Sequence, residues 1–394
     1  MPESVGSWDV KPVTVRVKVN PDVLRWAVDR TGMPLHELIQ RAGFHRLEEW
    51  MEGTQCPTLK QARALADLAC IPFGYLLLDA PTDDQPPLPD FRSVGSERVT
   101  EFSPELKTTI FSCEQRLGWF SEFSRVHDIQ PPLFTGSFSV EDDPVNAALH
   151  IGEELGSRGW TAGRAPRGRD NVLELAEVIE ECGVLVMRSS VMGKNSHRYL
   201  KVEEFRAFTL LDGQYGLIFV NGSDSKVGQY FSLAHELGHV LLARQGVTGD
   251  KNDHVGVERW CNAFGAALIL PPGELLTRWI SVGNLDSVVE WAYENYGVSA
   301  DTAVWMLVDR SQIMRRQAID FLSERTQHRN AHEGDAGGGN YYRNLKSRLG
   351  SLFLSTVVDA YVDKVISQEE AAKQLGIPKT ATFEKAVSSI LKVA

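Results

Sequence analysis

The chain has 394 residues, of which 43% are hydrophobic and 24% charged, and its formal net charge is −11. These values are ordinary for a soluble globular protein with two or three domains, and the negative charge disfavours nonspecific adhesion to nucleic acid. Its five cysteines form no CxxC pair, which argues against a disulfide framework and a thiolate zinc site. No apolar run approaches the ~18 residues of a membrane span and no signal peptide precedes residue 20, so we expect a cytoplasmic protein without membrane contact.

The first predicted elements lie before residue 81. Residues 13–19, VTVRVKV, alternate apolar and polar side chains as a short strand does. From Asn20 onwards apolar residues recur at helical spacing, with interruptions at residues 31–32, 42–43 and 53–57. This pattern predicts four or five short helices.

The middle of the chain predicts helices around a small sheet. Residues 173–190 read as a helix that stops at Gly183 and continues into a strand. Two more strands are expected in residues 204–211 and 215–222, joined by a turn at Asp212-Gly213. Helices then follow at residues 227–243, from Val257, and at residues 297–313, and Ser367 is expected to cap a helix near the end of the chain.

The chemistry of the chain is concentrated in residues 232–243, SLAHELGHVLLA. On a helix, His235 and His239 are one turn apart and face the same way, so both imidazoles can bind one zinc ion. Glu236 lies about 100° round the helix from His235, where it can exchange a proton with water without binding the metal. This arrangement is typical of a hydrolytic zinc site.

A catalytic zinc ion needs a third protein ligand, and the best candidate is Glu258 in residues 257–272, VERWCNAFGAALILPP. Small residues near the same helix face, including Gly265, would let this helix pack closely on the first. His254 and Asp253, which we expect in a polar loop, are the alternative ligands.

A resemblance to the ImmA/IrrE metallopeptidase family rests on FSLAHELGHVLL, on VERWCNAFGAALILPP after it and on EFRAFTLLDGQYGLIFVNGSDS before it. The N-terminal WMEGTQCPTLKQARALADLACIPFGYLLL with LPDFRS resembles the Xre-type helix-turn-helix domain often fused to that family, and YYRNLKSRLG begins a similar tail. The resemblance implies zinc ligands at His235, His239 and Glu258 and a general base at Glu236. Gly265 departs from the family's usual alanine.

The resemblance also implies a protein substrate, a helix-turn-helix repressor whose limited cleavage switches on stress or mobile-element genes. Long fused members often lie beside a toxin gene and are proposed antitoxins, so a cognate toxin is an expected partner. We expect the substrate to lie as an extended strand beside residues 216–222, GLIFVNG.

DNA contact by the N-terminal domain is less well supported by its charges. Residues 35–43 and 44–53 would form the helix-turn-helix, with the second segment as the recognition helix. That segment carries only His45 and Arg46 as candidate DNA contacts, against the acidic Glu48, Glu49 and Glu52. A docking or dimerisation module with the same fold, and hence a homodimer, stays open.

The expected fold is α+β and mainly helical, with an all-α helix-turn-helix domain, a zincin-like metallopeptidase domain with a small sheet, and a C-terminal helical domain. The predicted boundaries are 1–82 for the first domain, 83–99 for a linker, 100–324 for the metallopeptidase domain, 325–340 for a flexible linker and 341–394 for the last domain. The leading hypothesis is a zinc endopeptidase that cleaves a regulatory protein. The alternative is a DNA-binding regulator or antitoxin in which the peptidase fold is a sensor or binding surface.

Overall fold

The computed structural model describes residues 15–69, 71–82, 102–132, 134–163, 170–193, 198–243, 251–327, 341–377 and 380–391, without the side chains of residues 251–254, 326–327, 341–343, 389 and 391. The fold is mainly helical with one small sheet. Two compact units divide within helix α5 (Pro104–Val126), between Ile110 and Phe111. In the described part of the chain, no helix is both long and apolar enough to cross a membrane.

The first unit consists of a bundle of short helices before residue 83 and of the start of α5, up to Ile110. The bundle comprises α1 (Pro21–Arg30), α2 (Leu35–Gln40), α3 (Leu47–Met51), α4 (Leu59–Ala69) and the 3-10 helix η1 (Phe73–Leu77). The Asn20 side chain caps α1 by accepting from the Asp22 amide, and Pro21 occupies the first turn, where no amide donor is needed. Trp50 is almost fully buried in the core of this unit. The predicted four or five helices are therefore confirmed.

The predicted strand at residues 13–19 is wrong for the residues that the structure describes. From Val15 onwards the segment makes only one isolated bridge, between Arg16 and Thr58. The pairing ends there because the partner segment turns directly into α4. Residues 13 and 14 lie outside the described residues.

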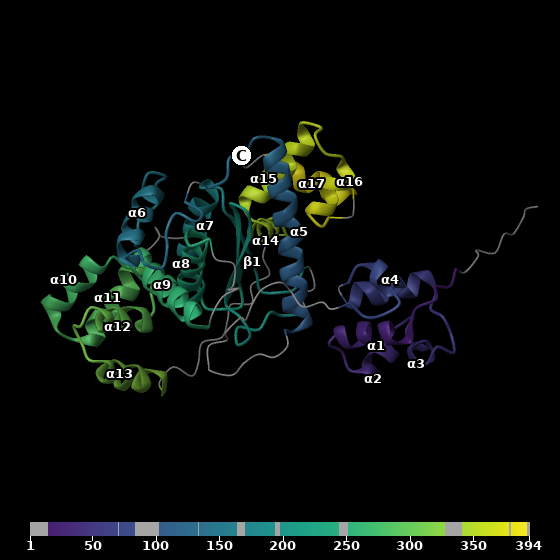
Figure 1. Ribbon diagram of the computed structural model, residues 1–394, viewed down its shortest axis with the longest axis horizontal. Coiled ribbons are helices and arrows are strands. Elements are labelled where there is room, and N and C mark those ends of the chain that lie inside the picture. The colour runs from purple at the N-terminus through teal and green to yellow at the C-terminus, as the bar shows by residue number, and fades with distance from the viewer. Residues whose placement is uncertain are drawn as a thin grey trace, which may run out of the picture. The chain divides into compact units, whose positions relative to one another are not determined.

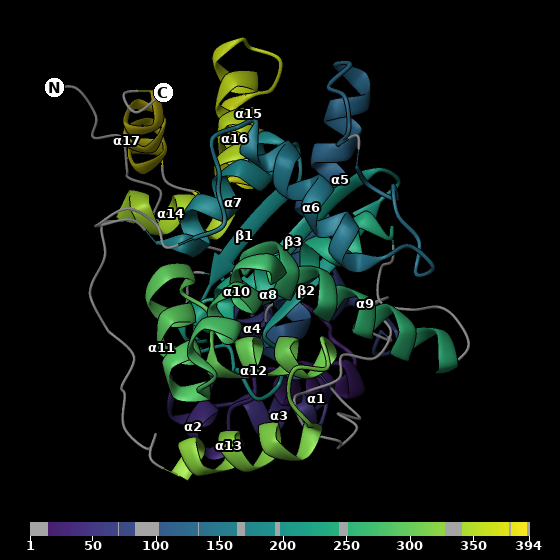
Figure 2. The same cartoon turned by 90° about the vertical axis from the view of Figure 1, so that its left-hand side faces the viewer.

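The second unit is built on the three predicted strands, β1 (Leu185–Ser189), β2 (Ala207–Asp212) and β3 (Tyr215–Asn221). Figure 2 shows β3 between the other two; it runs parallel to β1 and antiparallel to β2. The backbone groups on both sides of β3 are therefore used within the sheet. Our expectation of a substrate strand beside β3 is wrong, because the outer edges left by this order belong to β1 and β2.

Helices cover both faces of the sheet (Figure 1). One face carries α7 (Asn171–Glu181) and α8 (Lys226–Leu241), which share a core with Ile218 and Val220. On the other face Phe208 stacks on Phe219, and Phe120 of α5 meets Tyr215 edge to face. The remaining helices of this part of the chain are α6 (Pro144–Gly156), α9 (Lys251–Ile269), α10 (Pro272–Val282), α11 (Leu285–Tyr296), α12 (Ala300–Asp309) and α13 (Arg315–Gln327).

Several helices differ from expectation. The helices α10 and α11 were not predicted, although Pro272 opens the first and Asn284 caps the second. Helix α9 begins at Lys251 rather than near Val257, so the backbone of Asp253 and His254 is helical and not a loop. The segment between α8 and α9 is consequently shorter than predicted.

The C-terminal helices α14 (Tyr341–Leu349), α15 (Ser351–Val362), α16 (Gln368–Gln374) and α17 (Thr380–Leu391) lie in the second unit. Helix α14 packs against β1, and α15 contacts both α7 and β1. The Ser367 hydroxyl accepts from the Glu370 amide, which confirms the predicted cap. The predicted linker 83–99 lies outside the described residues, and α13 continues to Gln327, three residues into the second predicted linker.

Candidate metal centre

The two histidines lie on α8, which runs beneath the sheet. The Ser225 side chain accepts from the Gly228 amide and so caps the start of this helix. His235 and His239 are four positions apart on this helix, and their Nε2 atoms lie 3.2 Å apart. The helical spacing therefore turns both imidazoles toward one point.

Helix α9 brings Glu258 to the same point. Its Oε2 lies 3.4 Å from Nε2 of His235, and its Oε1 lies 3.3 Å from Nε2 of His239. One ligand atom from each residue can be chosen so that all three lie within 4.8 Å of one another. The structure thus brings together the three residues expected as ligands, whereas the side chains of Asp253 and His254 are among those it does not describe.

The close approach of α8 and α9 depends on two glycines. A Cβ atom on Gly265 would lie 2.9 Å from the backbone nitrogen of His235, which real Cβ atoms essentially never do. A Cβ atom on Gly238 would lie 3.1 Å from Sγ of Cys261. At Gly265, the missing methyl group allows α9 to contact the backbone of the candidate ligand His235.

Burial shapes the charges of the cluster. Burial alone would raise the pKa of Glu258, but hydrogen bonds from His235 and His239 and their charges hold it well below its usual range. Burial alone would lower the pKa of His235, but the hydrogen bond with Glu258 and the charges of Glu236 and Glu258 raise it. The Glu258 carboxylate is therefore ionised.

Glu236 has a different environment from the three candidate ligands. Its side chain is buried, and its Oε2 accepts a hydrogen bond of 2.7 Å from the hydroxyl of Thr209 on β2. The same hydroxyl lies 3.1 Å from the backbone oxygen of Glu236. Our sequence reasoning missed Thr209. One feature could have indicated it: Thr209 is a polar residue in a strand, and the residues two positions before and after it on the same face pack in the core.

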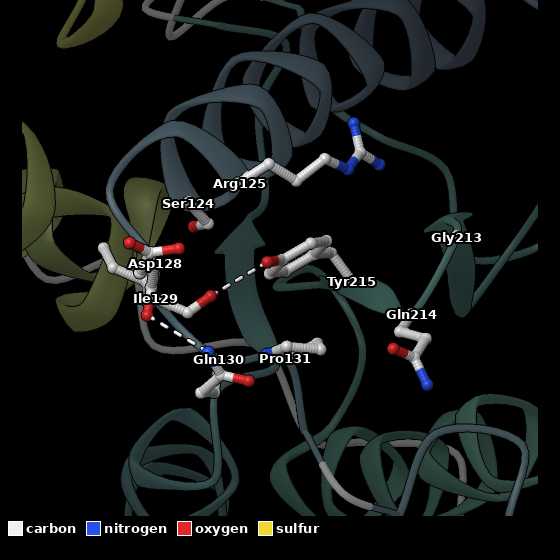
Figure 3. A pocket seen from close by; sticks show the side chains of 9 residues that line it. All are labelled: Ser124, Arg125, Asp128, Ile129, Gln130, Pro131, Gly213, Gln214 and Tyr215. Atoms are coloured by element: carbon white, nitrogen blue, oxygen red, sulfur yellow. Dashed lines mark hydrogen bonds between the residues drawn. The ribbon is translucent and has the colours of Figure 1, made fainter.

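A separate cavity of about 400 Å³ lies at the end of α5 and the β2–β3 hairpin. Figure 3 shows Tyr215 donating its hydroxyl hydrogen to the backbone oxygen of Ile129 at this cavity, beside Arg125. None of its lining residues belongs to the histidine cluster. The cavity is therefore distinct from the candidate metal centre.

The two candidate DNA-contact residues lie in the first unit, just before α3 rather than on it. His45 is exposed and its Nδ1 lies 2.9 Å from the backbone oxygen of Ile39. Arg46 is exposed and donates to Oε1 of Gln55 at 2.9 Å. Both side chains are held by local contacts, and α3 itself presents the acidic Glu48 to solvent.

Two helices present two imidazoles and a carboxylate, with a buried glutamate next to the first histidine, and this arrangement is typical of the zinc sites of metallopeptidases. Residues 179–307 match the family model described as an IrrE N-terminal-like domain, of the Peptidase M78 family. This part of the chain is therefore similar to the IrrE N-terminal-like domain.

Two curated relatives carry the name radiation response metalloprotease IrrE. The protein from Deinococcus deserti is 31% identical over 139 residues, which cover 32% of this chain and 46% of the relative. The protein from Deinococcus radiodurans is 26% identical over 138 residues, which cover 32% of this chain and 41% of the relative. The chain thus spans less than half the length of these relatives.

Proposed function

We propose that this chain is a zinc-dependent endopeptidase whose ligands are His235, His239 and Glu258 and whose general base is Glu236. The observation that carries the proposal is the convergence of the three ligand atoms within 4.8 Å beside a buried Glu236. Two imidazoles and one carboxylate are a ligand set of known catalytic zinc sites.

The proposed reaction divides its tasks between the cofactor and the chain. A zinc ion held by His235, His239 and Glu258 would supply Lewis-acid chemistry for the scissile carbonyl and the attacking water. Glu236 accepts the proton of the attacking water and returns it to the leaving amine.

The peptide would pair with the outer edge of β2. The sheet order leaves this edge without a neighbouring strand among the described residues. An added strand gains main-chain hydrogen bonds that do not depend on sequence. Because Thr209 of β2 contacts Glu236, a peptide on this strand would lie near the general base.

The substrate we propose is a regulatory protein, in particular a helix-turn-helix repressor, as the family resemblance implies. The names of the two relatives describe a radiation response in those organisms, and a stress-linked substrate here is our extension of that similarity. The alternative function is a DNA-binding regulator or antitoxin, in which the first unit with α2 and α3 acts as the reader and a toxin is the partner.

The experiment that separates these functions compares the wild type with Glu236→Gln and His235→Ala. New protein N-termini in cells producing each variant would be mapped by mass spectrometry, and zinc would be measured in each purified protein. Loss of general base catalysis typically lowers rates ~10²- to 10⁴-fold, so Glu236→Gln should bind zinc yet abolish the new N-termini. The exposed Glu290→Gln on α11 is the matched control and should behave as the wild type.

The outcome also identifies the substrate, because its cleaved fragment appears only with an intact Glu236. Equal N-termini in the wild type and in Glu236→Gln would refute the peptidase proposal. The regulator alternative would then require that deletion of residues 1–82 removes the cellular effect.

A further inference from the structure

We propose that Thr209 is a positioning residue for the reaction: its hydroxyl fixes the carboxylate of Glu236, so that the rate depends on β2. This inference rests on the proposed function and gives Thr209, a residue of β2, a role in the proposed reaction. In this proposal the side chain of Thr209 acts through Glu236 and neither binds the metal ion nor recognises the peptide.

The geometry selects the carboxylate as the partner of the hydroxyl. Oγ1 of Thr209 lies 2.7 Å from Oε2 of Glu236 and 3.1 Å from its backbone oxygen. A hydroxyl has a single proton, and the carboxyl oxygen at 2.7 Å is a nearer acceptor than the backbone carbonyl at 3.1 Å. The hydroxyl of Thr209 therefore donates its hydrogen bond to Oε2 of Glu236.

The donor is held rigidly. Thr209 pairs with Ile218 in the β2–β3 ladder, and only 5% of the residue is exposed. A β-branched side chain has few χ1 rotamers, so the hydroxyl direction follows from the strand backbone. Glu236 is 8% exposed, which limits the ability of bulk water to replace the threonine.

Among the described residues, Thr209 is the one side chain that donates a hydrogen bond to this carboxylate. The hydrogen bond holds Oε2 of Glu236 in place, and Oε1 of the same carboxylate remains available to exchange a proton with water and with the leaving amine. Without the contact, the flexible glutamate side chain would sample other rotamers. A misplacement of about 1 Å at a reacting group can cost about 100-fold in rate.

The test uses full-length protein and the substrate found by its Glu236-dependent cleavage. Thr209→Val keeps the β-branched shape but removes the donor, and Thr209→Ser keeps the donor. We expect Thr209→Val to lower kcat about 10- to 100-fold with KM within about threefold and zinc still stoichiometric, because no ligand is changed. Thr209→Ser should return kcat to within about fivefold of the wild type. The control is Thr277→Val on α10, whose exposed hydroxyl bonds only to its own helix.

A second measurement needs no activity. In zinc-free protein, Thr209→Val should shift the unfolding equilibrium constant about tenfold in the wild-type background and little in a Glu236→Ala background, because the partner is then absent. This cycle stays informative if the valine variant is too unstable for kinetics.

Full kcat in Thr209→Val would overturn the inference, as would equal shifts in the two backgrounds of the cycle. Parallel loss of zinc and activity in both Thr209 variants would make the role merely structural and overturn it too. An active, Glu236-dependent wild type with a fully active Thr209→Val refutes this inference alone. A wild type without Glu236-dependent cleavage refutes the proposed function and this inference with it.

Discussion

A buried carboxyl group joins α15 to the rest of its unit and should make the stability of that junction depend on pH. Glu180 of α7 is 6% exposed, and its oxygens accept hydrogen bonds from the amides of Ser351 at 2.9 Å and Leu352 at 3.1 Å. Burial raises the pKa of Glu180 to about 7, against the hydrogen bonds from Ser351, Leu352 and Val186 and the charge of Lys346. The perturbation we suggest is Glu180→Gln.

The sign follows from the direction of this pKa shift. In an unfolded chain the carboxyl loses its proton near pH 4.5, whereas in the folded state it keeps the proton up to about pH 7. Between these values the folded state holds more protons, so its stability is greatest below pH 4.5 and declines as the pH rises through 7. At about 1.4 kcal/mol per pH unit, the full effect is about 3 kcal/mol, most of it between pH 5 and pH 8.

The assay is native hydrogen exchange of the peptide that covers α15, corrected for intrinsic exchange and measured from pH 5 to pH 8. The opening free energy of the wild type should fall by about 2 to 3 kcal/mol more than that of Glu180→Gln over this range. The neighbouring Glu181→Gln is the control, since this side chain is exposed on the same helix. Parallel pH profiles for the wild type and Glu180→Gln would refute the reasoning.

Three further substitutions or reactions follow from close contacts. Gly350→Ala should weaken docking of α15 by about 2 to 4 kcal/mol, because φ is +78° and the new Cβ would lie 2.6 Å from the Val186 oxygen; an unchanged thermal midpoint would contradict this. Gly265→Ala should push α9 away from His235 and lower the free energy of unfolding by about 1 to 3 kcal/mol. It should also weaken zinc binding, measured by chelator competition, and an unchanged zinc affinity would count against this prediction. Burial raises the pKa of Cys261 well above its ordinary value, so iodoacetamide should label it only after unfolding, and labelling of the native protein would show that the thiol is accessible.

The candidate metal centre was predictable because its signals are local. The spacing of His235 and His239 fixes their common direction within one helical turn, whatever packs around it. Glu258 was predictable because small residues near its helix face indicated a close partner helix. The structure brings these side chains together, and their roles as ligands stay a prediction for the metal analysis.

The contacts that escaped prediction join segments far apart in the chain. Thr209 precedes Glu236 by 27 residues, and Glu180 precedes Ser351 by 171 residues, with no shared pattern in the sequence. The order of the strands in the sheet also depends on contacts between segments far apart in the chain, since β1 pairs with β3 and not with β2. The sequence did contain one signal for the central position of β3. Its apolar run is uninterrupted, which is typical of a strand covered on both faces, and every residue from Tyr215 to Asn221 is buried in the structure.

The position of β3 in the sheet has a consequence for the proposed reaction. Since β1 and β3 pair on one side and β2 and β3 on the other, an incoming peptide can extend the sheet only at an outer strand, and β2 is the one that reaches Glu236. Binding at β2 would hydrogen-bond the strand on both sides and restrict the motion of Thr209. The residue that fixes the general base would then be most rigid when a peptide is in place, so binding and proton transfer would be coupled through one strand.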